Sequence, residues 1–181
     1  MNFPDLNQAK ERLIESFADE AEIALSDIRV IASPYRICPL GAHIDHQGGP
    51  VLGMTINAYT LMAFTPIKES QVKLRSKNYP GKVKFDLRQI PEATGSFWGV
   101  YARAAALALQ EKYPLKHGFI GIINGMLPGC GLSSSASVLL AYLYALADIH
   151  NLKLTPWDFV NLTRKAENNY IGLNNGILDQ T

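Results

Sequence analysis

Cysteine is scarce in this sequence, and net charge is almost absent. The 181 residues contain two cysteines, Cys38 and Cys130, which are too few for a disulfide framework and lack the spacing of a metal-binding set. The 17 basic and 16 acidic residues leave a net charge of +1, so the chain lacks the basic surface that attracts nucleic acids or anionic membranes. We therefore expect a reducing, cytoplasmic setting, with neither a nucleic acid nor a membrane as partner.

Long apolar runs are missing as well. Residues 1–22 carry acids throughout and have no apolar core, which argues against a secretory signal or a transit peptide. The longest apolar stretch, residues 136–147, is too short to span a bilayer and contains two tyrosines. The chain is nevertheless 48% hydrophobic and long enough to bury a core, so residues 1–181 are expected to form one domain.

Hydrophobic periodicity divides the chain into helices and strands. Helices are predicted over residues 5–24, 98–113, 134–150 and 156–170. Strands are predicted over residues 28–33, 55–66, 71–76, 82–87 and 117–124. The three middle strands are expected to be antiparallel, joined by turns at 68–69 and 80–81.

Residues that typically start or end helices and strands add detail to this pattern. Pro34 is expected to end the first strand, which leaves residues 35–49 as mostly loop or edge strand. Thr155 is expected to cap the last helix, with Pro156 at its first position. Because strands come first and helices mostly later, the sequence favours an α+β fold over a doubly wound sheet.

The most informative segment is the run Leu127-Pro-Gly-Cys-Gly-Leu-Ser-Ser-Ser-Ala136. Gly129 and Gly131 permit tight turns close to a ligand, and successive N–H groups in such a turn form an anion-binding nest. The helix predicted to follow directs its free N–H groups at the same anion. Together these features favour a cradle for the phosphates of a nucleoside triphosphate.

A simpler interpretation of the same run is a plain turn in which Ser133 only caps the helix. Two common phosphate loops do not fit it. No Gly-Lys-Ser/Thr follows, so it is not a Walker A motif, and Ser134 replaces the third glycine of a dinucleotide fingerprint.

Two further segments carry clustered polar residues. Residues 36–49 combine Arg36, Asp45, His46 and Gln47 with a second histidine, an inventory suited to sugar hydroxyls. A solvated loop is the alternative, and the His-x-x-His spacing could bind a metal, although no third or fourth ligand is apparent. Residues 164–180 contain two acids of interest, Glu167 and Asp179, and the second lies close to apolar neighbours. A solvated terminal acid is the alternative there.

In this order the three segments resemble the GHMP small-molecule kinases, and within them the galactokinase branch. The similarity extends from about Ser33 to the last residue. It implies the amino-terminal domain of that family, related to ribosomal protein S5 domain 2, with a mixed or antiparallel twisted sheet and helices packed on it. It also implies ATP and Mg²⁺ as cofactors and a sugar or uronic acid as substrate.

The resemblance assigns roles to matching positions. Asp179 matches the catalytic base, and Arg36 matches its partner beside the transferred phosphate. The nucleotide contacts are matched by Gly129, Gly131, Leu132, Ser133, Ser134 and Ser135. The Mg²⁺ ligands are matched by Ser135 and Glu167. The substrate contacts are matched by Arg36, Ala42, His43, Asp45, Gly176 and Asp179.

Two departures from galactokinases concern the substrate. Galactokinases have a glutamate where this chain has Ala42, and a glycine where it has Tyr35. A glutamate about 4 Å from a C6 carboxylate would repel it by roughly 4 kcal/mol at an effective dielectric constant of about 20, which is about a thousandfold in affinity. Ala42 removes that repulsion, unless it is only a small residue in a tight loop. The stretch also resembles plant-type galacturonokinases, so we expect D-galacturonate, phosphorylated at its anomeric hydroxyl, over galactose.

Kinases of this family are considerably longer than this chain, so the resemblance covers their amino-terminal half. We therefore expect little or no activity from the chain alone, and self-association through an apolar face left by the missing half. A non-catalytic sugar- or nucleotide-sensing relative is the alternative function. The presence of Arg36, Glu167 and Asp179 together favours a kinase.

Overall fold

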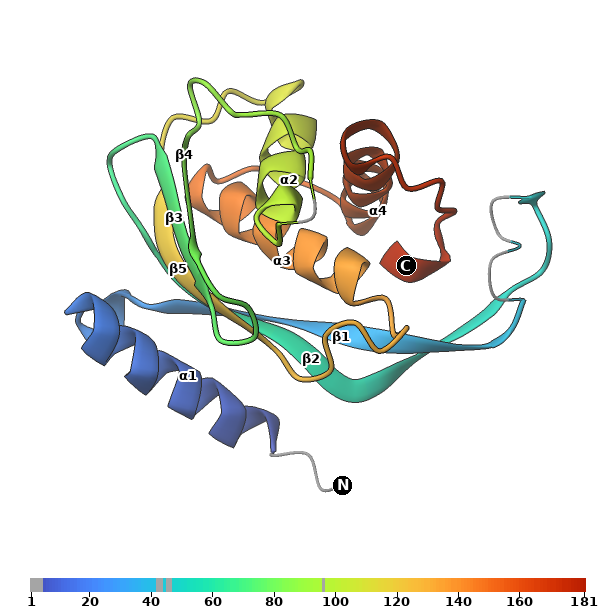
Figure 1. The fold of residues 1–181 in the computed structure, drawn as a ribbon, viewed down its shortest axis with the longest axis horizontal. Helices are drawn as coiled ribbons and strands as arrows, with labels where there is room; N and C mark the ends of the chain where they lie inside the picture. The colour runs from blue at the N-terminus through green and yellow to red at the C-terminus, as the bar shows by residue number, and fades with distance from the viewer. Residues whose placement is uncertain (1–4, 42–43, 45–46, 96) are drawn as a thin grey trace.

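A five-stranded mixed sheet forms the centre of the computed structural model, which describes residues 5–41, 44, 47–95 and 97–181 (Figure 1). The strands are β1 (Arg29–Leu40), β2 (Leu52–Pro66), β3 (Gln71–Ser76), β4 (Lys82–Asp86) and β5 (Phe119–Gly125). Their order across the sheet is β1-β2-β5-β3-β4. β3 and β5 are parallel, whereas the other neighbouring pairs are antiparallel. The α+β class expected from the sequence is confirmed.

The pairing of the middle strands differs from the prediction. β3 and β4 form the expected antiparallel hairpin, but β2 does not lie beside β3. β5 lies between them, antiparallel to β2 and parallel to β3. Turn residues mark where consecutive strands end, whereas the position of a strand that comes more than 30 residues later depends on tertiary packing.

β1 continues through Pro34, contrary to the expectation that this residue ends the strand. Within the described part of the chain, β1 is an edge strand that pairs only with β2, so a residue without an N–H is tolerated on its free side. The register of the pair shifts between Pro34 and Tyr35. Tyr35 and Arg36 therefore lie on a strand that is anchored to the sheet, within the stretch expected to be loop or edge strand.

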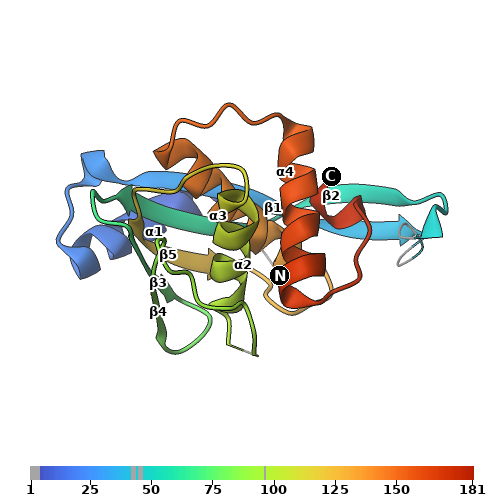
Figure 2. The ribbon, with the colours of Figure 1, turned by 90° about the horizontal axis from the view of Figure 1, so that it is seen from above.

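Helices cover both faces of the sheet (Figures 1 and 2). α1 (Leu6–Ala21) packs alone on one face, where Leu13 and Phe17 form a small core with three sheet residues, Leu61, Ala63 and Ile122. The other side carries α2 (Val100–Gln110), α3 (Ser134–Ile149) and α4 (Pro156–Lys165). Alanines dominate the contacts of α2 and α3, and such small side chains let the two helices approach each other closely.

The last helical segment changes type within the predicted range 156–170. It starts as predicted, with Pro156 first and a capping box in which Thr155 and Asp158 bond reciprocally. After Lys165 the backbone widens into a π-helical turn, Ala166–Ile171, a type of turn that occurs frequently at functional sites. Among the residues described, no helix is long and apolar enough to cross a membrane.

Candidate active site

An ion pair joins the edge strand to the end of the chain. Asp179 lies in a short 3-10 turn, Leu178–Gln180, and its Oδ1 accepts a hydrogen bond from Arg36 Nε at 2.9 Å. The Arg36 Nη2 group donates to the same oxygen. Only 17% of the Arg36 side chain and 23% of the Asp179 side chain are exposed, so the pair is largely shielded from solvent. Shielding strengthens the attraction between the two charges.

Glu167 is a buried carboxylate on the π-helical turn, with no exposed surface. Its Oε2 accepts hydrogen bonds from Asn175 Nδ2 at 3.1 Å and from Gln180 Nε2 at 2.5 Å, and the Ser135 hydroxyl also contacts the carboxylate. Burial raises the pKa of Glu167, and the nearby negative charge of Asp179 adds to that effect. Its second oxygen, Oε1, is buried without a partner.

The loop between β5 and α3 has the backbone of an anion nest. Gly129, Gly131 and Ser133 have φ values of 74°, 72° and 56°, so left-handed residues alternate along the loop. An added Cβ would meet nothing within 4 Å at either glycine, so it is the backbone angle that favours glycine at these positions. The loop leads directly into Ser134 at the start of α3, whose free N–H groups favour an anion.

Ser133 does not act as the simple helix cap that was the alternative interpretation. It occupies the capping position, but its side chain makes no capping hydrogen bond, and its Oγ is buried without a partner. A serine with positive φ is also strained. Strain and an unpaired buried hydroxyl are typical of a binding loop rather than of a plain turn.

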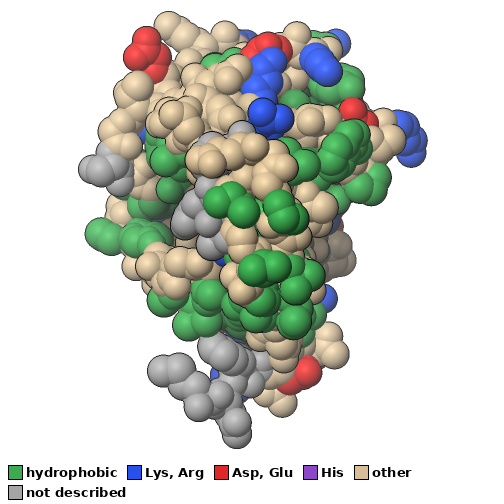
Figure 3. Space-filling view, turned by 90° about the vertical axis from the view of Figure 1, so that its right-hand side faces the viewer, with side chains coloured by type: hydrophobic (Ala, Val, Ile, Leu, Met, Phe, Trp, Pro, Cys, Tyr) green, Lys and Arg blue, Asp and Glu red, His purple; other side chains and the backbone are tan. Residues whose placement is uncertain are grey.

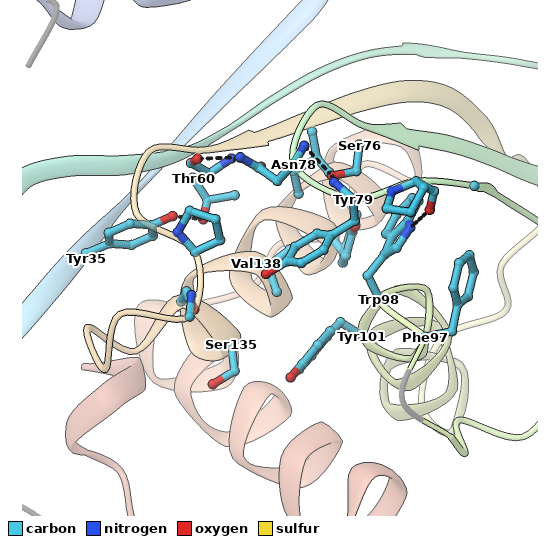
Figure 4. A pocket seen from close by; sticks show the side chains of 18 residues that line it. Tyr35, Thr60, Ser76, Asn78, Tyr79, Phe97, Trp98, Tyr101, Ser135 and Val138 are labelled. Carbon is cyan, nitrogen blue, oxygen red and sulfur yellow. Dashed lines mark hydrogen bonds between the residues drawn. The ribbon is translucent and has the colours of Figure 1, made fainter.

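A cavity of about 670 Å³ opens beside this loop (Figure 4). Gly129, Ser134 and Ser135 line one end. The opposite wall is aromatic and is formed by Tyr79, Phe97, Trp98 and Tyr101. Trp98 is held by a hydrogen bond from Nε1 to the Pro80 carbonyl oxygen at 3.0 Å. An aromatic wall next to an anion nest suits a flat heterocycle attached to phosphates.

The aromatic wall was not predicted from the sequence. Phe97 and Trp98 precede α2, which begins at Val100 and not at residue 98 as predicted. Tyr79 lies in the β3–β4 connection, and no local pattern associates it with residues some 20 positions later. The only local signal was the density of aromatic side chains around residues 97–101.

Several sequence-predicted residues converge. The backbone N–H of Arg36 donates to the carbonyl oxygen of Leu132 at 3.4 Å, which brings the Arg36–Asp179 pair against the glycine loop. Ser135 contacts Glu167, and the negative charge of Asp179 raises the pKa of Glu167. Gly176 lies in the loop just before the turn that carries Asp179. Ala42, His43, Asp45 and His46 lie outside the described residues.

The His-x-x-His metal site, the other interpretation of these histidines, also falls on residues that the structure does not describe. Among those it does describe, no group of three or more His, Cys, Asp or Glu side chains gathers as a metal site. Glu167 and Ser135 could still contribute two oxygen ligands to a Mg²⁺ ion that phosphates and water also hold.

The fold and this constellation define an α+β domain in which a loop with the backbone geometry of an anion nest lies beside a carboxylate–guanidinium pair. Residues 100–181 match the GHMP kinases N terminal domain, and residues 15–66 match the galactokinase galactose-binding signature. The chain belongs to the GHMP kinases, of which it carries the amino-terminal domain.

Individual relatives agree with this assignment. The chain is 44% identical to a galacturonokinase of Arabidopsis thaliana and 36% identical to a galactokinase of Lactococcus lactis. These matches cover 98% and 97% of this chain but only 45% and 44% of the relatives, so the chain spans somewhat less than half their length. It superposes with a TM-score of 0.86 on the crystal structure of Lactococcus lactis galactokinase complexed with galactose, over 98% of this chain and 45% of that one, at 34% identity.

Proposed function

We propose that the chain is the nucleotide- and sugar-binding half of an ATP-dependent kinase that phosphorylates the anomeric C1 hydroxyl of a hexose or hexuronic acid. The observation that carries this proposal is the Arg36–Asp179 pair, whose arginine is hydrogen-bonded through its backbone to the glycine loop. A base beside a phosphate-binding loop is what phosphoryl transfer to a hydroxyl requires, since that reaction depends on positioning and charge stabilisation.

Each part of the site has a task in this mechanism. The loop from Gly129 to Ser135 binds the phosphates through its backbone N–H groups, and the aromatic wall accommodates the base of the nucleotide. Asp179 orients the sugar hydroxyl and accepts its proton. Arg36 holds the Asp179 carboxylate in place and faces the negative charge of the transferred phosphoryl group.

The residues present fit a Mg²⁺ ion. Glu167 Oε1 is a buried carboxylate oxygen without a partner, and the Ser135 hydroxyl lies beside the same carboxylate. Both are hard oxygen ligands of the kind that Mg²⁺ prefers. When bound, the ion would neutralise charge on the nucleotide phosphates. The remaining Glu167 oxygen is kept in place by Asn175 and Gln180.

D-galacturonate is the substrate that we favour. Its support is Ala42, which removes the repulsion that a glutamate would exert on a C6 carboxylate, together with the 44% identity to a galacturonokinase. D-galactose is the second candidate, because the galactose-binding signature matches residues 15–66.

Cys38 and Cys130 are free thiols, which agrees with the cytoplasmic location that remains a prediction.

Two measurements on the chain test the proposal. Calorimetric titration with a non-hydrolysable ATP analogue and Mg²⁺ tests the nucleotide site, and absence of binding would overturn it. ADP release is then measured with galacturonate, galactose and glucuronate. Release with galacturonate supports the proposed substrate, whereas release with galactose alone would overturn it. Nucleotide binding without release for any sugar would favour a sensing module or an inactive half.

A further inference from the structure

We propose that Asn168 is a positioning residue for the proposed Mg²⁺ site, because its side-chain amide clamps the backbone of Asn175, whose own amide orients the Glu167 carboxylate. The proposal rests on the proposed function, in which Glu167 binds the ion. It concerns an asparagine that follows Glu167 directly in the chain and that has no task in the mechanism above.

The chain reverses direction after the π-helical turn that carries Glu167 and Asn168. Gly172 ends this turn with a φ of 84°, and the Leu173 N–H donates to the carbonyl oxygen of Glu167 at 2.9 Å. The segment that follows leads from the end of the turn to the C-terminal 3-10 turn (Figure 1). Asn175 lies in this returning segment, four positions before Asp179.

A single side chain holds both backbone groups of Asn175. The Asn168 Nδ2 group donates to the Asn175 carbonyl oxygen at 3.2 Å, and Asn168 Oδ1 accepts the Asn175 backbone N–H at 3.1 Å. A side-chain amide can donate and accept at the same time, so it pairs with a backbone as another strand of backbone would. Two bonds to one residue fix its orientation as well as its position.

The side chain of Asn175 is directed back to the turn. Its Nδ2 group donates to Glu167 Oε2 at 3.1 Å, and Gln180 Nε2 donates to the same oxygen at 2.5 Å. The other carboxylate oxygen, Oε1, is buried without a partner. The two donors therefore determine which oxygen of Glu167 stays available to an ion. Partners that orient a metal ligand in this way contribute to the affinity for the metal.

Neighbouring asparagines show that polarity of the segment alone does not create this network. Asn169 and Asn174 are exposed, and their side chains make no hydrogen bond within the described part of the chain. Asn168 and Asn175, by contrast, are half-buried and joined across seven positions. Local bonds of asparagine to the backbone span two to about four positions, so this clamp is not an ordinary turn motif.

The test compares the chain with its Asn168→Ala variant by two readouts. Amide hydrogen exchange, followed by NMR, reports the Asn175 N–H, and we expect it to accelerate by about three- to tenfold, the change that loss of one net hydrogen bond produces. Mn²⁺ binding in the presence of a non-hydrolysable ATP analogue is measured by electron paramagnetic resonance. We expect it to weaken by about tenfold, the lower end of the range for residues that support metal ligands.

A second variant, Asn175→Ala, separates the two links. It removes the donor to Glu167 but keeps the backbone that Asn168 clamps, so Mn²⁺ binding should weaken while the N–H at position 175 stays protected. The double variant is expected to bind Mn²⁺ no more weakly than Asn175→Ala alone, since both changes act through one bond. Additive losses would overturn the proposal. Unchanged Mn²⁺ binding in Asn175→Ala would overturn it even where Asn168→Ala does not fold.

Asn169→Ala and Asn174→Ala are the matched controls and are expected to leave both readouts unchanged. Affinity for the ATP analogue without a divalent ion, measured by calorimetry in a chelator, should be the same in Asn168→Ala as in the unmodified chain. A merely structural Asn168 would weaken metal-free nucleotide binding and Mn²⁺ binding alike, and that result would overturn the proposal. Normal Mn²⁺ binding in Asn168→Ala would overturn it too.

Failure of the proposed function looks different from failure of the clamp. If the unmodified chain binds neither the ATP analogue nor Mn²⁺, the proposed function is overturned, and the positioning role falls with it. If the unmodified chain binds both and Asn168→Ala binds both equally well, the proposed function stands and only the positioning role of Asn168 is overturned.

Discussion

Arg36 and Asp179 are separated by 143 positions in the chain, yet Arg36 Nε donates to Asp179 Oδ1 at 2.9 Å. Both side chains are largely shielded from solvent. The strand that carries the arginine is also hydrogen-bonded to the loop that precedes α3. This single contact connects the chemistry proposed for the site to the place where phosphates are proposed to bind, and it leads to the first prediction.

In the full-length enzyme, replacing either partner is expected to lower turnover sharply while sparing nucleotide binding. In Asp179→Asn the base is lost, and sugar-dependent ADP release is expected to fall by about 10²–10⁴-fold. Arg36→Lys is expected to impair release as well, because an ammonium group cannot reproduce the planar guanidinium contacts. Calorimetry with the ATP analogue supplies the control. Near-normal turnover of Asp179→Asn would refute the assignment.

The buried carboxylate of Glu167 is expected to lower the stability of the fold, although it is needed at the proposed Mg²⁺ site. Burial raises its folded pKa above the unfolded value, so the ionised carboxylate destabilises the fold at neutral and alkaline pH and has no such effect below the unfolded pKa of about 4.5. Glu167→Gln should therefore raise the melting temperature at pH 8, by about 2–4 °C for each kcal/mol gained, and not at pH 4.

The same Glu167→Gln variant is expected to bind Mn²⁺, used as a spectroscopic substitute for Mg²⁺, more weakly in the presence of the ATP analogue. Thermal unfolding followed by circular dichroism measures the stability change. The exposed Glu92→Gln variant is the control and should show neither effect. An equal rise of the melting temperature at both pH values would contradict the explanation from charge burial.

The contribution of Glu20 to stability depends on pH in the opposite direction to that of Glu167. The carboxylate accepts hydrogen bonds from Lys77 at 2.5 Å and Arg75 at 2.9 Å, and these contacts, Lys77 first, lower its pKa to about 2. Because the folded pKa lies below the unfolded one, the stabilisation is complete above about pH 4.5 and is lost as the pH falls toward 2.

Substituting Glu20→Gln should consequently lower the free energy of unfolding at pH 6, by at most about 1 kcal/mol because the pair is near the surface, and by less at pH 2.5. Urea unfolding at both pH values measures the difference. Glu11→Gln, on the exposed side of α1 and without an ion pair among the described residues, is the control. A constant difference across the pH range would contradict the prediction.

Ala42 is predicted to decide between a neutral sugar and a uronic acid. Introducing a carboxylate through Ala42→Glu is expected to reduce the affinity for galacturonate by about a thousandfold, as estimated from roughly 4 kcal/mol of repulsion. Affinity for galactose, which has no carboxylate, should not fall in the same way. Ala42→Gln, similar in size but uncharged, separates repulsion from crowding. Equal losses in both variants would attribute the effect to space alone.

Self-association is predicted through apolar side chains at the far end of the β1–β2 pair. Leu40, Leu52 and Met54 are 63%, 53% and 55% exposed, and hydrophobic side chains gather on this face of the molecule (Figure 3). Exposed apolar patches favour association. Sedimentation velocity over a wide range of concentrations should show oligomers that Leu52→Asp with Met54→Asp disperses. Leu25→Asp, equally exposed elsewhere, should have no effect, and an unchanged distribution in the double variant would contradict the prediction.

Much of the architecture follows from local sequence signals. The helices and most strand positions depend on residue periodicity, and the capping box of α4 depends on residues three positions apart. Local patterns failed where a neighbouring element decided the outcome. Pro34 stays in a strand because β1 has no partner on one side, and β5 separates β2 from β3 because the sheet is completed by a later segment.

By itself, the sequence determined the family and the glycine–serine loop, because the residues that adopt positive φ in this loop are encoded within ten consecutive positions. Only the tertiary structure decided which groups meet there. The aromatic wall, the contact between Ser135 and Glu167, and the Arg36–Asp179 ion pair all join segments far apart in the chain. Their juxtaposition depends on the packing of whole elements, and no local spacing of residues specifies it.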